Sequence, residues 1–271
     1  MSDKKPKRTV HLRPRYYRWF VEPDVEWVET NTGYATLDWQ VPIDQSAVVL
    51  IDVWECHYLQ DTSARSEQII QQKIRPLLAA CRQHGLQLIH APAPNVAKHY
   101  LDWRPKSRQT PEPLTETNQS TRWPPSDFRR KSGLYTDFAK PKEARQNEID
   151  HLVANRQMHP DVRPEGADVV VADGQELHRF CSQRQILFLF YLGFNTNACI
   201  LMRDYGTLEM SKRGYEIIVL RDCTTGMESH QTHDLLWQTR GAVLFLEMFG
   251  KHSITSPELI DALATSRSDL E

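Results

Sequence analysis

Cys199 is the residue of this chain with the clearest potential for covalent chemistry. The apolar run 186–191 is typical of a buried strand, Gly193 ends it, and the cysteine follows where a helix is expected to begin. Free backbone N–H groups and the positive end of the helix dipole favour a thiolate at such a position, and a thiolate is a nucleophile. The alternative is a cysteine that only packs beneath the sheet edge.

Asp52 is a candidate partner for this cysteine. It follows the apolar run 47–51, which also indicates a buried strand. Open α/β sheets build their sites at the carboxyl ends of parallel strands. If the two strands are neighbours, Asp52 and Cys199 have the arrangement of a base and a nucleophile. The alternative for Asp52 is a cap or turn residue.

The elements that must position these residues alternate between strand and helix patterns. This order predicts an α/β fold: a three-layer, Rossmann-like sandwich with a mostly parallel, roughly six-stranded sheet. The expected strands are residues 47–53, 86–90, 167–172, 186–192, 216–220 and 253–255. The expected helices are residues 64–84, with a kink at Pro76, and residues 175–184, 197–213, 230–247 and 256–266.

Composition bounds the class of protein. The chain has 271 residues, 40% of them hydrophobic and 25% charged, with a net charge of −2. It therefore suits one large α/β domain and carries no general signature of nucleic-acid or membrane binding. Its five cysteines form no CxxC pair, which favours reduced thiols and a cytoplasmic location.

Two segments depart from the alternating pattern. Residues 1–45 form an irregular, basic N-terminal arm with interspersed aromatic side chains, which we expect to pack on its own domain or a neighbouring subunit rather than on RNA. Residues 46–271 form the main domain. Within it, residues 93–165 are rich in proline and aromatic residues, which predicts an ordered insertion that serves as a lid over the site or as an oligomer contact.

Residues 46–271, outside that insertion, resemble the isochorismatase-like cysteine hydrolases, a family that includes nicotinamidases and other small-amide hydrolases. The segment 193–199, Gly-Phe-Asn-Thr-Asn-Ala-Cys, is similar to the family's Gly-x-x-Thr-[Asn/Asp]-x-Cys element. The first strand with Asp52, and Asp204, Gly214, Tyr215 and the segment 219–223, also follow the family pattern.

The resemblance implies a mechanism. In this family an Asp takes the thiol proton, the Cys attacks a carbonyl carbon, and a Lys supports both charges. By the match, Asp52 is the base and Cys199 the nucleophile, and the backbone N–H groups of Asn195 and Cys199 stabilise the oxyanion. A non-proline cis peptide bond is expected at Phe194–Asn195. The family usually forms dimers or tetramers, so a homo-oligomer is expected.

The family Lys is missing from this chain. Counting back from Phe180 by the family's spacing reaches Gly174, and no Lys occurs between Lys142 and Lys212. An Asp and a thiolate repel each other without a cation between them.

Several residues could replace the Lys. The candidates are His178, which we place in the catalytic set, and Arg179, His57, Lys140 or Lys142. The remaining alternative is that the site has lost hydrolysis.

A second departure follows Asp52. The family often reads Asp-x-Gln-x-x-Phe, whereas this chain has Trp54 at the Gln position and His57 at the Phe position. A His there could bind substrate or protonate a leaving group, or it could only be held in the wall by a backbone carbonyl. The predicted substrate-binding residues are Trp54, His57, Phe194 and Asn195. The segment 91–95 lacks the Asp and His residues of the nicotinamidase metal site, so we predict no catalytic metal and no cofactor.

The sequence thus predicts a cysteine hydrolase that cleaves a C–N bond of a small amide-like substrate through a thioester-type intermediate. A second hypothesis, motivated by the missing Lys, is a non-catalytic relative that retains the pocket and binds a ligand. A third is an acid–base enzyme that uses Asp52 without covalent catalysis, against which the presence of Cys199 counts. The expected partner is a small-molecule substrate, with no nucleic acid or membrane.

Overall fold

The structure is a computed structural model that describes residues 8–105 and 123–268. The chain divides into two compact units. The first comprises Met1–Pro105 with Arg156–Glu271, and the second comprises Lys106–Asn155.

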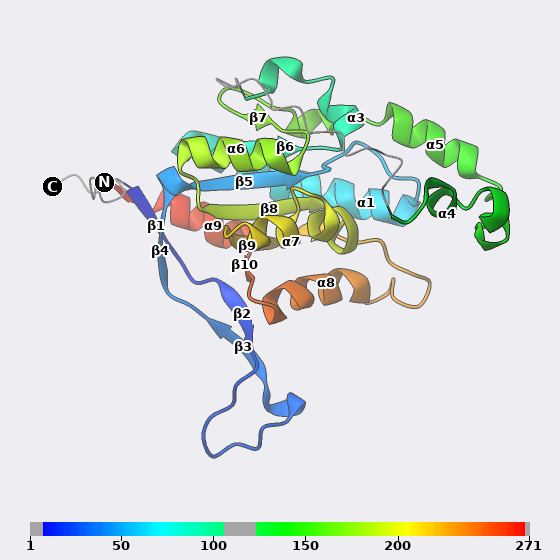
Figure 1. Cartoon of the computed structure of the whole chain (residues 1–271). Coiled ribbons are helices and arrows are strands. Elements are labelled where there is room, and N and C mark those ends of the chain that lie inside the picture. The colour runs from blue at the N-terminus through cyan, green and yellow to red at the C-terminus, as the bar shows by residue number, and fades with distance from the viewer. Residues whose placement is uncertain (1–7, 106–122, 269–271) are drawn as a thin grey trace. The chain divides into compact units, whose positions relative to one another are not determined.

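A large sheet organises the first unit (Figure 1). Its eight strands have the order β3-β2-β10-β9-β8-β5-β6-β7. The six from β10 to β7 run parallel to one another, whereas β2 (Arg15–Arg18) and β3 (Gly33–Thr36) at the edge are antiparallel. The six are β5 (Ser46–Ile51), β6 (Gln87–Ala91), β7 (Val169–Val170), β8 (Phe188–Phe194), β9 (Glu216–Thr225) and β10 (His252–Ile254). The predicted mostly parallel sheet of about six strands is confirmed.

Helices cover both faces of this sheet because the central strands are apolar on both sides. Val48 and Leu50 of β5 join one buried cluster, whereas Val49 and Ile51 join the other. The first cluster includes side chains of α2 (Arg75–His84) and α9 (Ser256–Ala264). The second includes side chains of α6 (Gly174–Arg184) and α7 (Thr207–Lys212). This is the predicted three-layer sandwich.

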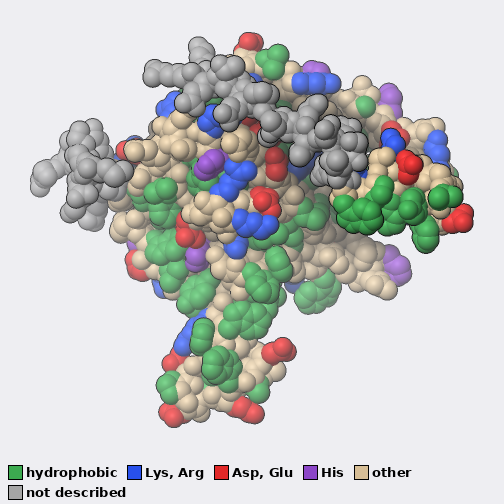
Figure 2. Space-filling view, in the orientation of Figure 1, with side chains coloured by type: hydrophobic (Ala, Val, Ile, Leu, Met, Phe, Trp, Pro, Cys, Tyr) green, Lys and Arg blue, Asp and Glu red, His purple; other side chains and the backbone are tan. Residues whose placement is uncertain are grey.

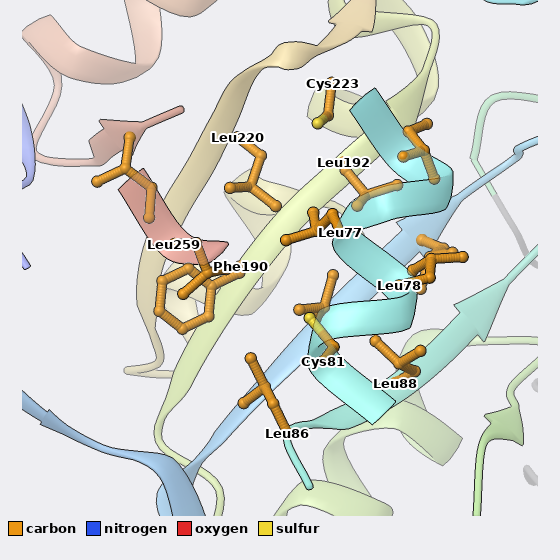
Figure 3. Close-up of a cluster of buried hydrophobic side chains, with 14 of the residues drawn as sticks. Leu77, Leu78, Cys81, Leu86, Leu88, Phe190, Leu192, Leu220, Cys223 and Leu259 are labelled. Carbon is orange, nitrogen blue, oxygen red and sulfur yellow. The ribbon is translucent and has the colours of Figure 1, made fainter. Parts of the chain in front are cut away.

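The first cluster is drawn in Figure 3. Leu77 and Cys81 extend from α2 toward the sheet, where Phe190 and Leu192 of β8 lie. All four side chains are at most 1% exposed. At about 25 cal/mol per Å² of buried apolar surface, this layer is a main source of the stability that holds β8 in place.

The helix expected at residues 64–84 is interrupted just before Pro76. α1 (Gln60–Ile69) passes into a π-helical turn (Ile70–Ile74), and α2 then begins with Pro76 in its first turn. Proline has no N–H and clashes with the carbonyl one turn earlier, so a regular α-helix cannot pass through it. The kink predicted at Pro76 therefore takes the form of a π-turn immediately before it.

The expectation of an irregular arm at residues 1–45 is wrong for the part that the structure describes. β1 (Arg8–Leu12) pairs with β4 (Trp39–Pro42) and β11 (Arg267–Ser268) in a small sheet. β2 (Arg15–Arg18) and β3 (Gly33–Thr36) form a hairpin that extends the large sheet beyond β10. The sequence hides these strands because both faces of the hairpin are partly solvated and carry polar residues, which weakens the alternation.

The loop that joins β2 to β3 carries aromatic side chains that the first unit leaves exposed. Phe20 is 63% exposed and Trp27 is 66% exposed. Figure 2 shows hydrophobic side chains on the projecting lobe that the β2–β3 hairpin and its loop form. Neighbouring rings contact one another, as Phe20 and Trp27 do at 5.4 Å between centroids.

The predicted insertion at residues 93–165 is shared between the two units, and residues 106–122 lie outside the described part. In the first unit it contains the short helix α3 (Pro94–Ala97) and the segment from Arg156 onward. In the second unit, α4 (Ser126–Arg130) and α5 (Gln146–Asn155) flank a 3-10 segment (Gly133–Phe138). Among the helices described, none has the length and apolarity needed to span a membrane.

Candidate active site

The ends of two neighbouring strands form the centre of the site. β5 and β8 pair in parallel, with Ile51 opposite Gly193, so the residues that follow them leave the sheet side by side. Asp52 follows β5, and Cys199 lies in a π-helical turn (Thr196–Ile200) shortly after β8. The two strands that precede Asp52 and Cys199 are therefore neighbours, as the arrangement of a base and a nucleophile requires.

Gly193 allows the two strand ends to approach closely. Its φ is +115°, and a Cβ built there would lie 1.9 Å from the carbonyl oxygen of Ile51. No other residue fits without moving β5 or β8. Asp52 has a φ of +46°, and the Phe194–Asn195 peptide bond is cis, at the place that the family resemblance implied.

The Asp52 carboxylate is buried and fully engaged. It is 3% exposed. Oδ1 accepts a hydrogen bond from the backbone N–H of Ala93 at 2.6 Å, and Oδ2 accepts one from Nη2 of Arg203 at 3.0 Å. A buried carboxylate needs such donors, because burial without them costs several kcal/mol.

Arg203 is therefore the cation of the site, and none of the candidates predicted from the sequence was this residue. It lies four positions after Cys199, so the same segment supplies both the thiol and the positive charge. Burial lowers the pKa of Arg203, but the charge of Asp52, the neighbouring Tyr205 and Cys199, and the hydrogen bond to Asp52 together raise it above its ordinary value. The guanidinium thus stays charged beside Asp52 at any working pH.

The position that the resemblance assigns to the family Lys is closed by the same segment. A Cβ built at Gly174 would lie 2.0 Å from the carbonyl oxygen of Asp204. The backbone N–H of Gly174 also donates to Oδ2 of Asp204 at 2.8 Å. A side chain that began at Gly174 would collide with the turn that carries Arg203, so the missing Lys and the new Arg are structurally linked.

Cys199 has a thiol that is less acidic than the sequence suggested. Burial, the charge of Asp52 and a hydrogen bond with Asp52 raise its pKa to about 11, while Arg203 and the backbone of Asn195 act in the opposite direction. The expected lowering by the helix start is outweighed by these effects. At neutral pH the resting Cys199 is therefore a protonated thiol.

His178 does not join Asp52 and Cys199. Its Nδ1 lies 2.8 Å from the hydroxyl of Tyr215, and no contact described for it reaches either residue of the site. The prediction that placed His178 in the catalytic set as the replacement cation is corrected in favour of Arg203. The reason is that the ring leaves α6 toward the Gly214–Tyr215 turn that precedes β9.

The other candidate cations also lie outside the described contacts of the site. Arg179 belongs to the same helix as His178 and makes no ion pair among the described residues. Lys140 and Lys142 belong to the second compact unit.

Trp54, His57 and Phe194 form an aromatic wall next to Asp52. The Trp54 ring lies 5.1 Å from each of the other two ring centroids. Phe194 is completely buried, so it supports the wall from behind, whereas Trp54 also lines a cavity. The structure thus brings together three of the predicted substrate-binding residues, of which Trp54 lines the cavity, and their binding role remains a prediction.

His57 is held neutral in this wall. Its Nδ1 accepts a hydrogen bond from the N–H of Leu59 at 3.0 Å, which places the ring proton on Nε2. Burial and the nearby charge of Arg156 lower its pKa to about 4. His57 is therefore a neutral hydrogen-bond donor at pH 7 and does not supply the positive charge of the site.

A narrow, half-open cavity of about 10 Å³, which is room for about one water molecule, lies beside Asp52. Its lining consists of Asp52, Val53, Trp54, Pro92, Val96, Arg156, Gln157 and Met158. Arg156 was missed by the sequence analysis. It lies more than 100 residues from Asp52 along the chain, and no local pattern marks it.

Two polar atoms close to Asp52 and Cys199 are buried without a hydrogen-bond partner in the part of the chain that the structure describes. They are Oδ1 of Asn195 and Nε of Arg203. Unpaired buried polar atoms are costly and are concentrated at functional sites. One is an acceptor and the other a donor.

A metal centre has no obvious ligands in the described residues, which contain no group of three or more His, Cys, Asp or Glu placed to hold an ion. His90, at the end of β6, instead contacts Oδ2 of Asp168 at 3.1 Å. The absence of a catalytic metal and of a cofactor remains a prediction.

Comparison with known proteins agrees with this architecture. The model of the isochorismatase domain matches residues 46–245. A cysteine hydrolase from Pseudomonas syringae pv. phaseolicola 1448A superposes with a TM-score of 0.51 at 15% identity, covering 84% of this chain and 96% of that one.

Two further solved structures are more distant. An isochorismatase family protein from Desulfovibrio vulgaris subsp. vulgaris str. Hildenborough has a TM-score of 0.48 at 14% identity, covering 81% of this chain and 98% of that one. An N-carbamoylsarcosine amidase from Thermoplasma acidophilum has a TM-score of 0.40 at 13% identity, covering 78% and 96%. A search of curated proteins finds no match. Since the family model spans most of the chain, this protein belongs to the isochorismatase family.

Proposed function

We propose that this protein is a cysteine hydrolase that cleaves a C–N bond in a small amide-like substrate. The observation that carries the proposal is the arrangement around Asp52. This buried carboxylate is paired with Arg203 and acts electrostatically on the Cys199 thiol, so a base, a nucleophile and a cation meet at one strand end. Such a set activates a weak nucleophile at the moment of attack.

The first half of the reaction forms an acyl-enzyme. Asp52 takes the thiol proton as the sulfur of Cys199 attacks the carbonyl carbon, and the carbonyl electron pair moves to oxygen. The backbone N–H groups of Asn195 and Cys199 are the proposed donors to this oxyanion. Its collapse breaks the C–N bond, the proton on Asp52 passes to the leaving nitrogen, and a thioester remains on Cys199.

The second half returns the enzyme to its resting state. A water molecule attacks the thioester carbon while Asp52 accepts a proton from the water. The C–S bond breaks, and the proton on Asp52 returns to the sulfur. The products are the amine released in the first half and a carboxylic acid, and Cys199 is again a thiol.

Arg203 has two roles in this scheme. It donates a hydrogen bond to Oδ2 of Asp52 and so holds in place the carboxylate that accepts the proton. It also opposes the effect of Asp52 on Cys199, since the positive charge stabilises the thiolate that develops during attack. Arg203 would thus support the charges of the Asp and the Cys as the family Lys does, although it comes from a different part of the fold.

The test is a screen of small amides, imides, ureides and hydrazides with the wild type, Cys199→Ala and Cys56→Ala. Cys56 is a half-buried cysteine outside the proposed machinery, so its variant is a matched control. We expect turnover in the wild type and the control and none in Cys199→Ala, with a transient mass increase on Cys199 in rapid-quench spectra. Turnover by Cys199→Ala would contradict the proposal.

A non-catalytic binding protein is the second candidate. The observation in its favour is the raised pKa of Cys199, since an unactivated thiol is a poor nucleophile. The two candidates differ in what they do to a ligand. A binding protein holds an amide that Cys199→Ala holds equally well, without any covalent adduct in the wild type.

A further inference from the structure

We infer that the substrate carries an anionic group, such as a carboxylate, and that Arg156 binds it beside Trp54. The reaction at the other end of the substrate rests on the proposed function, but the anion site does not depend on catalysis. The inference follows from the position of Arg156, from its contacts and from the balance of charge around the cavity.

The backbone fixes the position of Arg156. The segment that follows Asp52 is joined to the segment that follows Arg156 by an antiparallel bridge between Trp54 and Met158. The N–H of Glu55 donates to the carbonyl of Gln157 at 3.2 Å, and the N–H of His159 donates to that of Val53 at 3.0 Å. This pairing brings Arg156 to the cavity that Asp52 also lines.

The guanidinium of Arg156 is half-buried and lacks a carboxylate partner among residues 8–105 and 123–268. It lies over the Trp54 ring, 5.4 Å from the centroid. A guanidinium that stacks on an aromatic face keeps its N–H edge available for a planar anion. The nearby acid, Glu55, is exposed and accepts the N–H of Gln157 through Oε1.

A second arginine strengthens the positive field on the far side of His57. Arg65 is held by neutral acceptors: the hydroxyls of Thr62 and Thr225 and the carbonyl of Gly226. Arg65 and Arg156 both act electrostatically on His57, which is neutral. Since Arg203 offsets the charge of Asp52, the surroundings of the cavity retain an excess of positive charge.

The chemistry of the ligand follows from this arrangement. Arginine binds carboxylates through two parallel hydrogen bonds, which fix both position and orientation. Asp52 and Arg156 line the same narrow cavity, so a ligand that reaches both holds its anion a short distance from the group beside Asp52. The substrate class is therefore a short amide or ureide that also carries a carboxylate a few bonds from the scissile C–N bond.

The first test compares a charged and a neutral alkylating agent at the same sulfur. Iodoacetate and iodoacetamide differ only in the carboxylate, and their rate ratio at Cys199 is read by peptide mass spectrometry. We expect the ratio in the folded protein to exceed that in the unfolded protein by about tenfold or more, as for a charge-assisted hydrogen bond. Arg156→Gln should remove this preference, and Arg156→Lys should retain part of it.

Arg163→Gln is the matched control, because Arg163 is an exposed arginine shortly after Arg156 and lies outside the cavity. The variant removes the same charge from the same region and should leave the ratio unchanged. An equal ratio in the folded and unfolded wild type, or equal losses in both variants, would overturn the inference.

The second test does not need a reactive thiol. Titration calorimetry on Cys199→Ala compares the binding of propanoate with that of propanamide. We expect propanoate to bind, and to bind more weakly as the salt concentration rises. The double variant Cys199→Ala, Arg156→Gln should not bind propanoate. No preference for propanoate over propanamide would overturn the anion site. A different outcome would separate the two proposals. If neither reagent alkylates Cys199 but propanoate still binds in a way that depends on Arg156, the proposed hydrolase activity is contradicted and the anion site is supported.

Discussion

Nη2 of Arg203 donates a hydrogen bond to Oδ2 of Asp52 across 3.0 Å, and this arginine leaves the chain four residues after Cys199. One turn of the chain thus supplies both the thiol and the cation that the neighbouring carboxylate requires. The site is complete without a residue from the start of α6, where Gly174 contacts the same turn.

The first prediction concerns the cation. Arg203→Gln should raise the pKa of the Cys199 thiol further and lower turnover by two orders of magnitude or so, because Asp52 loses its partner and the developing thiolate loses a positive charge. Arg203→Lys keeps a positive charge, so it should have a smaller effect on both the thiol pKa and the turnover. His178→Ala should leave the thiol pKa unchanged. The rate of Cys199 alkylation against pH measures the thiol pKa in all three variants. If His178→Ala changes this pKa as much as Arg203→Gln does, His178 rather than Arg203 is the cation of the site.

The second prediction concerns the space at Gly174. Gly174→Ala should destabilise the fold by about 1–3 kcal/mol, since its Cβ would lie 2.0 Å from the Asp204 carbonyl oxygen and the turn must move. Gly241→Ala is the control, because nothing lies within 4 Å of a Cβ there and the site is inside α8 (Trp237–Met248). It should stabilise by about 0.5–1 kcal/mol. Urea unfolding measures both, and equal stabilities would show that the contact is not tight.

The third prediction concerns pH. The pKa of His57 is lowered to about 4, whereas an unfolded histidine titrates near 6.5. Between these values the unfolded chain binds more protons, so stability falls as the pH falls from about 6.5 to about 4. The pKa of His90 is also lowered by burial and contributes in the same direction. Thermal unfolding against pH should be flatter in His57→Gln, and an NMR titration that places His57 near 6.5 would contradict the neutral ring.

Much of the fold follows from the sequence because both faces of the central strands are buried. The continuous apolar runs before Asp52 and Gly193 leave strand as the simple interpretation, and the alternation with helices then fixes a parallel sheet. The hairpin of β2 and β3 did not follow, because its strands are partly solvated and pair through contacts distant in the sequence.

The site was predictable only in part, for a related reason. Asp52 and Cys199 are marked by local patterns, a strand end and a helix start. Arg203 carried a usable signal, since a residue four positions after Cys199 falls on the same side of a helix. Arg156 carried none, because its position depends on pairing between segments about 100 residues apart.

The central claim is that Asp52 is both the base that takes the thiol proton and a cause of the raised pKa of Cys199. The most direct measurement is the rate of Cys199 alkylation by iodoacetamide against pH in the wild type and Asp52→Asn, with exposed Asp44→Asn as control. We predict a wild-type midpoint near 11, a clearly lower midpoint and faster labelling at pH 8 in Asp52→Asn, and no change in Asp44→Asn. A midpoint that stays the same or rises in Asp52→Asn would contradict the coupling on which the proposed mechanism depends.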